Sequence, residues 1–154
     1  MISFDEARNI IWNTACHTKI GSENIPLSKL SRRVCFENVR SPLETPPFDN
    51  SAMDGFAVIR EDLLNASPEN PLTLQKVGMI AAGDSPCKKQ LQSKQCLHIM
   101  TGAPVPAGAN AVVPIEFIKI VNDKIFFENC PKTNDNIRFS GEDFKKNDLI
   151  LTKG

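Results

Sequence analysis

The residue whose surroundings best suit chemistry is Asp54, which lies in a stretch rich in turn-forming residues. Residues 46–58 read PPFDNSAMDGFAV. The two prolines fix φ and remove two backbone donors, so the chain enters this stretch stiff and extended. Asp54-Gly55 then reverses the chain into an apolar run with strand character. A carboxylate held at such a turn can serve a metal ion or a proton, although Asp before Gly is also an ordinary turn pair.

The residues before Asp54 favour a loop with few alternative conformations. Asp49, Asn50 and Ser51 can each turn a side-chain oxygen back onto neighbouring backbone N–H groups. Ala52 and Met53 then allow one tight helical turn.

A second stretch with chemical capacity is residues 99–113, IMTGAPVPAGANAVV. A strand is expected to end at Thr101-Gly102, where a hydroxyl and a backbone without a side chain can approach a ligand closely. The prolines that follow reduce the entropy of holding the loop in place. The stretch is equally compatible with a plain Gly/Pro loop between two buried strands.

The third stretch is residues 136–143, NIRFSGED. Arg138 can bind an anion through two parallel hydrogen bonds, while Glu142 and Asp143 can hold a hard cation through oxygen. Gly-Glu-Asp is also typical of an exposed acidic turn.

The elements that must position these residues begin with one helix. Residues 3–6 have the capping-box spacing, with Ser3 as the cap and Glu6 reaching back. Apolar residues at helical spacing over 4–15 then predict an amphipathic helix over 3–20, ended by Gly21 in a left-handed conformation. Its apolar stripe, together with Trp12, requires a partner surface.

The rest of the chain has β character. We expect a short helical turn within 26–33, a strand over 34–39, and a stiff linker at 41–47 that is the candidate domain boundary. Further strands are predicted by the apolar runs 56–59, 72–80, 96–100 and 111–115. Residues 117–121 and 124–127, separated by Asn122-Asp123, predict a hairpin.

Composition excludes several classes of protein. Lys and Arg together number 18, as do Asp and Glu, so the formal net charge is zero and a nucleic-acid partner is not expected. No apolar run reaches the length of a membrane span. The first residues lack a basic start and an apolar signal core, which favours a cytoplasmic location. Five scattered cysteines without a Cys-x-x-Cys pair argue against a zinc site or a disulfide framework.

Together and in this order, the three stretches resemble the three signatures in the N-terminal half of the molybdopterin molybdenumtransferase family, which includes the gephyrin E region. The resemblance extends to Ala81-Ala82-Gly83 and the N-terminal helix, so it spans essentially the whole chain. It implies a mainly β (α+β) fold with one N-terminal amphipathic helix, in an elongated two-part arrangement. A small discontinuous domain (1–45 and 140–154) would flank a mostly β domain (46–139).

The family's larger α/β domain has no counterpart in this sequence. The resemblance therefore implies an N-terminal portion that is inactive by itself, with the stripe of the first helix packing towards the absent domain. It also implies a homodimer.

Members of the family insert molybdate into adenylated molybdopterin and release AMP, using a divalent cation such as Mg²⁺. Carried over by position, the resemblance makes Asp54, Thr101 and Asp143 the catalytic candidates, with Asp54 and Asp143 as possible Mg²⁺ ligands. Asp54 could alternatively position an attacking water.

The resemblance also offers three candidates for substrate binding: Ser51, Gly102 and Arg138. Ser51, like Asn50, could instead fix the loop. Where many members carry arginine this sequence has His98, Phe139 and Ser140, and each lost exposed cation weakens attraction for an anion by up to about 1 kcal/mol. A non-catalytic dimerisation or scaffold module of the same fold is the alternative.

Overall fold

The computed structural model describes residues 1–18, 21–85, 90–121 and 124–154. Its one α-helix is α1, Phe4–His17, and the predicted capping box is confirmed because Ser3 and Glu6 each bond to the other's backbone N–H. The predicted glycine cap was wrong. The helix ends at His17, before the predicted end at residue 20, and Thr18 is its C-cap in an extended conformation. No residue of α1 is buried, and Trp12 is 69% exposed.

The segment between α1 and the sheet region contains little regular structure. The 3-10 turn η1, Leu27–Lys29, confirms the helical turn predicted there. The strand predicted over 34–39 was wrong, because only β1, Val39–Arg40, is extended and paired, with β10, Leu149–Leu151. Before β1 the side chain of Asn38 accepts the N–H of Lys153, so a backbone ladder does not continue there.

A six-stranded sheet carries the core, and its strand order is β6-β3-β5-β4-β8-β7. Neighbours are antiparallel except β4 and β5, which are parallel. The four strands predicted from the apolar runs 56–59, 72–80, 96–100 and 111–115 are confirmed, and so is the pairing of the hairpin. Its turn residues Asn122 and Asp123 lie outside the described residues. The strands are β3 Gly55–Val58, β4 Leu72–Ile80, β5 Gln95–Ile99, β6 Ala111–Pro114, β7 Ile118–Val121 and β8 Lys124–Phe127. Two 3-10 turns, η2 Arg60–Leu63 and η3 Ile115–Phe117, follow β3 and β6.

The central strands are buried on both faces. Phe56 and Val58 of β3 belong to one apolar cluster with Phe127, whereas Ala57 between them belongs to a second cluster with Ile99. Successive side chains of a strand point to opposite faces, so a strand covered on both sides reads as a continuous apolar run. This explains why β3, β5 and β6 show no apolar/polar alternation in the sequence.

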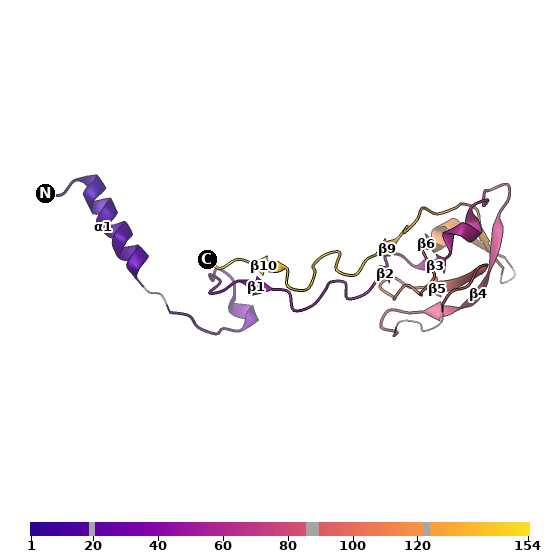
Figure 1. Cartoon of the computed structure of the whole chain (residues 1–154), viewed down its shortest axis with the longest axis horizontal. Coiled ribbons are helices and arrows are strands. Elements are labelled where there is room, and N and C mark those ends of the chain that lie inside the picture. The colour runs from indigo at the N-terminus through magenta and orange to yellow at the C-terminus, as the bar shows by residue number, and fades with distance from the viewer. Residues whose placement is uncertain (19–20, 86–89, 122–123) are drawn as a thin grey trace. The chain divides into compact units, whose positions relative to one another are not determined.

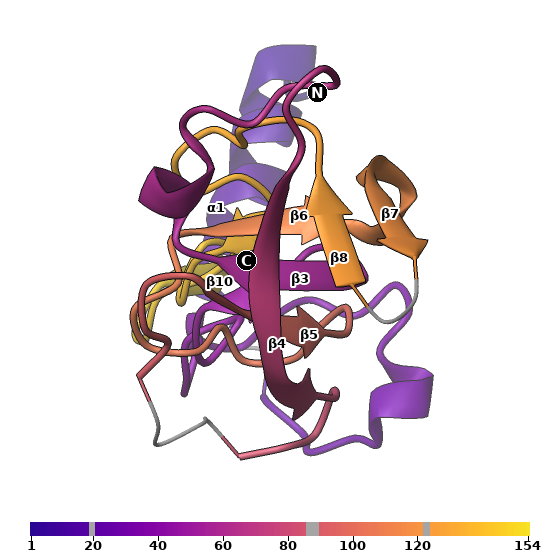
Figure 2. The ribbon, with the colours of Figure 1, turned by 90° about the vertical axis from the view of Figure 1, so that its right-hand side faces the viewer.

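Strand β4 changes its partner along its length, as Figure 2 shows. Residues 72–74 pair with β8, and residues from Gln75 onward pair with β5, with a register irregularity between Lys76 and Met79. An irregularity of this kind bends a strand. The sheet therefore curls at the middle of β4.

The predicted linker 41–47 forms backbone hydrogen bonds with a distant part of the chain. It lies beside residues 141–148, linked by bonds from Ser41 N to Asp148 O, from Thr45 N to Phe144 O and from Gly141 N to Pro46 O. The linker is therefore held by hydrogen bonds to a distant segment, in addition to the stiffness that its prolines give it.

Contacts along the chain divide it into two units. One consists of Met1–Val39 with Leu151–Gly154, and the other of Arg40–Ile150. Figure 1 labels α1 of the first unit and, in the second unit, the strands β2 to β6 and β9. These bounds differ from the expected domains 1–45, 46–139 and 140–154, which stay a prediction. Within the described residues, no helix is long and apolar enough to cross a membrane.

Candidate active site

The three chemical stretches of the sequence meet at a two-residue strand, β2, Asn50–Ser51. On one side β2 pairs antiparallel with β9, Ile137–Arg138, with Asn50 opposite Arg138. On the other side Ser51 donates its N–H to the carbonyl of Ala103, and the N–H of Gly102 donates to the carbonyl of Ser51. Segments far apart in the sequence are therefore held together by backbone hydrogen bonds.

The loop after β2 is fixed by Ser51. Its hydroxyl donates to the carbonyl of Met53 at 2.6 Å and accepts the N–H of Met53 at 3.3 Å. The tight helical turn that Ala52 and Met53 allow does not form, because the serine oxygen accepts the Met53 N–H that a helix would direct to a carbonyl. Ser51 is 1% exposed, which suits a loop-fixing role better than contact with a ligand.

Asp54 is exposed and is held by Thr101. Its Oδ1 accepts the backbone N–H of Thr101 at 2.6 Å and the hydroxyl of Thr101 at 2.8 Å. The Asp54 carbonyl accepts the N–H of Ile115, which anchors the backbone as well. The structure thus brings together two of the three catalytic candidates, with Gly102 as the next residue along the chain.

Both bonds from Thr101 favour the ionised carboxylate. The pKa of Asp54 lies below its ordinary value, chiefly because of the Thr101 N–H, then because of its hydroxyl, with His98 acting in the same direction. The carboxylate is therefore negatively charged at neutral pH. Among the described residues Oδ2 of Asp54 accepts no hydrogen bond, so this oxygen can receive a ligand.

The third stretch forms an ion pair of its own. Arg138 donates from one terminal nitrogen to Oδ1 of Asp143 at 2.6 Å, and its Nε lies 4.0 Å from Glu142. The hydrogen bond to Asp143 raises the pKa of Arg138. Two carboxylates thus offset one guanidinium, which weakens Arg138 as an anion clamp. Within the described residues, no hydrogen bond or ion pair joins Asp143 to Asp54 or Thr101.

Two contacts that the sequence did not reveal fix the third stretch against the first. Asp49 Oδ1 accepts the N–H of Ser140 at 2.8 Å, and the hydroxyl of Ser140 donates to Glu44 at 3.1 Å. The polar residues around Pro46-Pro47 gave no sign of partners almost a hundred positions away. The two loops are consequently held by side chains as well as by the β2–β9 pairing.

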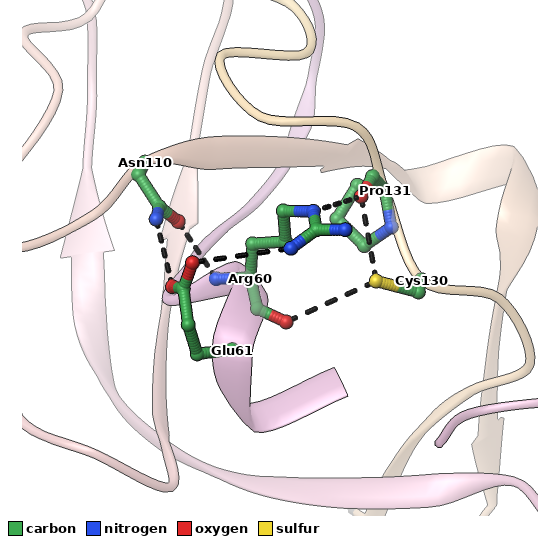
Figure 3. A network of polar contacts seen from close by, with 5 residues as sticks. All are labelled: Arg60, Glu61, Asn110, Cys130 and Pro131. Carbon is green, nitrogen blue, oxygen red and sulfur yellow. Dashed lines mark hydrogen bonds and ion pairs between the residues drawn. The ribbon is translucent and has the colours of Figure 1, made fainter. Parts of the chain in front are cut away.

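A hollow of about 440 Å³ adjoins the loop but not its acids. Its lining includes Met53, Pro114, Phe117, Cys130 and Asn136, and excludes Asp54, Thr101 and Asp143. A polar network fixes one wall, because Arg60 donates to the carbonyl of Pro131 at 3.0 Å (Figure 3).

The same network reaches Asn110. Its side chain accepts the N–H of Arg60 at 2.7 Å and donates to Glu61 at 2.8 Å (Figure 3). The bond from Asn110 is the main reason why the pKa of Glu61 lies below its ordinary value. Sequence reasoning did not find this hollow, since its lining residues carry no common motif.

The donor set decides how well Mg²⁺ fits. No group of three or more metal-binding side chains occurs in the described part of the chain. However, Mg²⁺ keeps several waters and needs only one or two protein carboxylates when phosphates complete its shell. Asp54 fits this requirement through Oδ2. Asp143 fits it less well, because the Arg138 guanidinium already holds its Oδ1.

Fold and site together define a β-rich module that presents an ionised carboxylate on a tightly bonded loop cluster. Residues 2–154 match the family model described as "MoeA N-terminal region (domain I and II)". The chain belongs to this family.

Relatives agree with this assignment. A molybdopterin molybdenumtransferase of Haemophilus influenzae is 39% identical over 100% of this chain, and one of Bacillus subtilis is 38% identical over 90%. A crystal structure of the molybdopterin biosynthesis moeA protein from Pyrococcus horikoshii superposes with a TM-score of 0.79 at 36% identity over 86% of the chain. The chain spans 37% of the Haemophilus protein, 34% of the Bacillus protein and 35% of the Pyrococcus chain.

Proposed function

We propose that this chain supplies the N-terminal part of a molybdopterin molybdenumtransferase, which inserts molybdate into adenylated molybdopterin and releases AMP. The observation that carries the proposal is the Asp54–Thr101 pair, in which two hydrogen bonds hold an exposed carboxylate in its charged form. The names of relatives that align over the whole chain support the reaction class.

Asp54 acts as a fixed negative charge rather than as a general base. A base is most effective when its pKa lies near the working pH, and the Thr101 bonds move the pKa of Asp54 the other way. The carboxylate instead orients a cation or a water through Oδ2. Thr101 holds the carboxylate in place, and Gly102 leaves room for a ligand beside it.

Asp54 would hold Mg²⁺, with Asp143 as a further candidate if Arg138 releases it. A bound Mg²⁺ would mask phosphate charge and act as a Lewis acid in the exchange of AMP for molybdate. Arg138 would contact an anionic part of the substrate, at the cost of its pairing with Asp143. Ser51 would stabilise the loop through the hydrogen bonds of its hydroxyl to the backbone of Met53.

The complete enzyme would be a cytoplasmic homodimer in which this chain works with a further α/β domain. The exposed apolar residues of α1 support a partner surface of this kind. The chain by itself would be inactive, because it spans little more than a third of its relatives.

A chimera tests the proposal. This chain would replace the matching N-terminal region of the Haemophilus influenzae relative, and molybdenum insertion and AMP release would be measured. We expect activity from the unchanged chimera and a loss of about 10²–10³-fold for Asp54→Asn. The matched control is Glu69→Gln, an exposed acid in another turn, which should keep full activity.

Circular dichroism would establish that each chimera is folded. A folded but inactive unchanged chimera would contradict the proposed function and favour a scaffold module. Full activity of the Asp54→Asn chimera would contradict the role of Asp54.

A further inference from the structure

The corner at which β4 leaves β8 and joins β5 contains a second hollow, of about 790 Å³. The two partner strands diverge at this corner, since residues 72–74 pair with β8 and Gln75 pairs with β5. The hollow includes Lys94, which precedes β5, whereas Thr101 follows the other end of this strand. The hollow is therefore separate from the Asp54 site.

Lysines from three segments line this hollow: Lys76 of β4, Lys94 of the loop before β5 and Lys124 of β8. None of the three forms an ion pair among the described residues. The chain as a whole has zero formal charge, so three unpaired cations around one concavity are a local excess. An excess of this kind attracts anions.

Lys94 is held at the hollow by its backbone. Its N–H donates to Asp62 at 2.6 Å, and Ser93 donates its hydroxyl to the other oxygen of Asp62 at 2.7 Å. Lys94 has φ 64°, a conformation that Gly or Asn adopts more readily. Asp62 is not part of the lining and, within the described part of the chain, forms no ion pair with the three ammonium groups, although its negative charge reduces the local excess.

The remaining lining suits an organic phosphate. Thr73 and Gln75 add neutral donors, while Phe126, on the same face of β8 as Lys124, gives an apolar floor. Ammonium groups bind phosphate as point charges. We propose that this hollow, the lysine corner, binds a phosphorylated organic anion. This inference does not depend on the proposed function.

The test is an NMR titration of the full chain at low ionic strength with inorganic phosphate and with phenyl phosphate. We expect saturable shifts at the amides of residues 73–76, 94–95 and 124–126, with tighter binding of phenyl phosphate because of the apolar floor. Lys76→Gln and Lys124→Gln should each weaken binding about two- to fivefold. Added salt should weaken it further.

The matched control is Lys146→Gln, an exposed lysine outside the hollow, which should leave the affinity unchanged. The proposal fails if the shifts do not saturate, or if Lys146→Gln weakens binding as much as Lys76→Gln. It also fails if a glutamate hexapeptide binds at the corner while both phosphates do not, since the partner would then be an acidic protein segment.

Discussion

Asp54 and Thr101 lie 47 positions apart in the sequence, yet one carboxylate oxygen accepts two hydrogen bonds from a single threonine. The residue types in the two stretches predicted candidates for chemistry. Their direct contact was not predictable from local sequence, because it depends on Ser51 bonding to both Gly102 and Ala103. The sequence also made Asp143 a candidate beside Asp54, but its ion pair is with Arg138 of its own loop.

The contact makes a prediction about pH. Thr101→Val removes the hydroxyl donor and keeps the N–H, so the pKa of Asp54 should rise towards its ordinary value of 3.8. Thr101→Ser, which keeps a hydroxyl, should leave it low. A carbon-detected NMR titration of the Asp54 carboxyl would measure both values. Equal pKa values for Thr101→Val and the parent chain would show that the hydroxyl bond does not form in solution.

The sign of the linkage follows from the lowered pKa. Because the folded chain binds the Asp54 proton more weakly than the unfolded chain, the Thr101 bonds stabilise the fold fully above the ordinary pKa. That contribution is lost as the pH falls through the folded value. Urea unfolding at descending pH should therefore show a steeper loss for the parent chain than for Thr101→Val.

At the scale of elements, short apolar runs predicted most of the sheet, and the capping-box spacing predicted the start of α1. Apolar runs are sufficient to locate β3 to β8, and each of these strands except β7 contains buried residues. The predictions failed at the ends of elements and for the shortest strand pairs. In the strand expected over 34–39, the side chain of Asn38 accepts the N–H of Lys153, so a ladder of backbone hydrogen bonds does not form there. Strands β2 and β9 have two residues each, which is too few to show a periodic pattern in the sequence.

Strand β3 gives a prediction about packing. A Cβ at Gly55 would meet the carbonyl oxygen of Val113 at 2.1 Å, because β3 and β6 approach closely where the Asp54 turn begins the strand. Gly55→Ala should therefore push the strands apart and destabilise the fold by about 1–3 kcal/mol. Urea unfolding followed by fluorescence or circular dichroism would measure this loss.

Gly78 is the matched control for that change. It also lies within a strand, β4, but nothing stands within 4 Å of an added Cβ and its φ is not positive. Gly78→Ala should leave stability within about 0.5 kcal/mol or improve it, since glycine weakens a strand interior. A similar loss for both variants would show that the close approach of β3 to β6 is not what requires glycine at position 55.

At the scale of the whole molecule, the two units differ in what holds them. The unit Arg40–Ile150 contains both apolar clusters, whereas α1 in the other unit has no buried residue. The sequence predicted an apolar stripe on this helix in need of a partner. It did not predict the pairing of residues 41–47 with 141–148, because prolines indicate stiffness without indicating a neighbour.

We propose that Asp54 and Thr101 act as one unit in molybdenum insertion, and a double-mutant cycle in the chimera tests this proposal most directly. Thr101→Val should reduce molybdenum insertion about tenfold when Asp54 is present, through loss of a bond to a charged group. In the Asp54→Asn background it should cost almost nothing further, since residues that act together are not additive. Equal losses from Thr101→Val in both backgrounds would show that the two side chains work independently and would contradict the account.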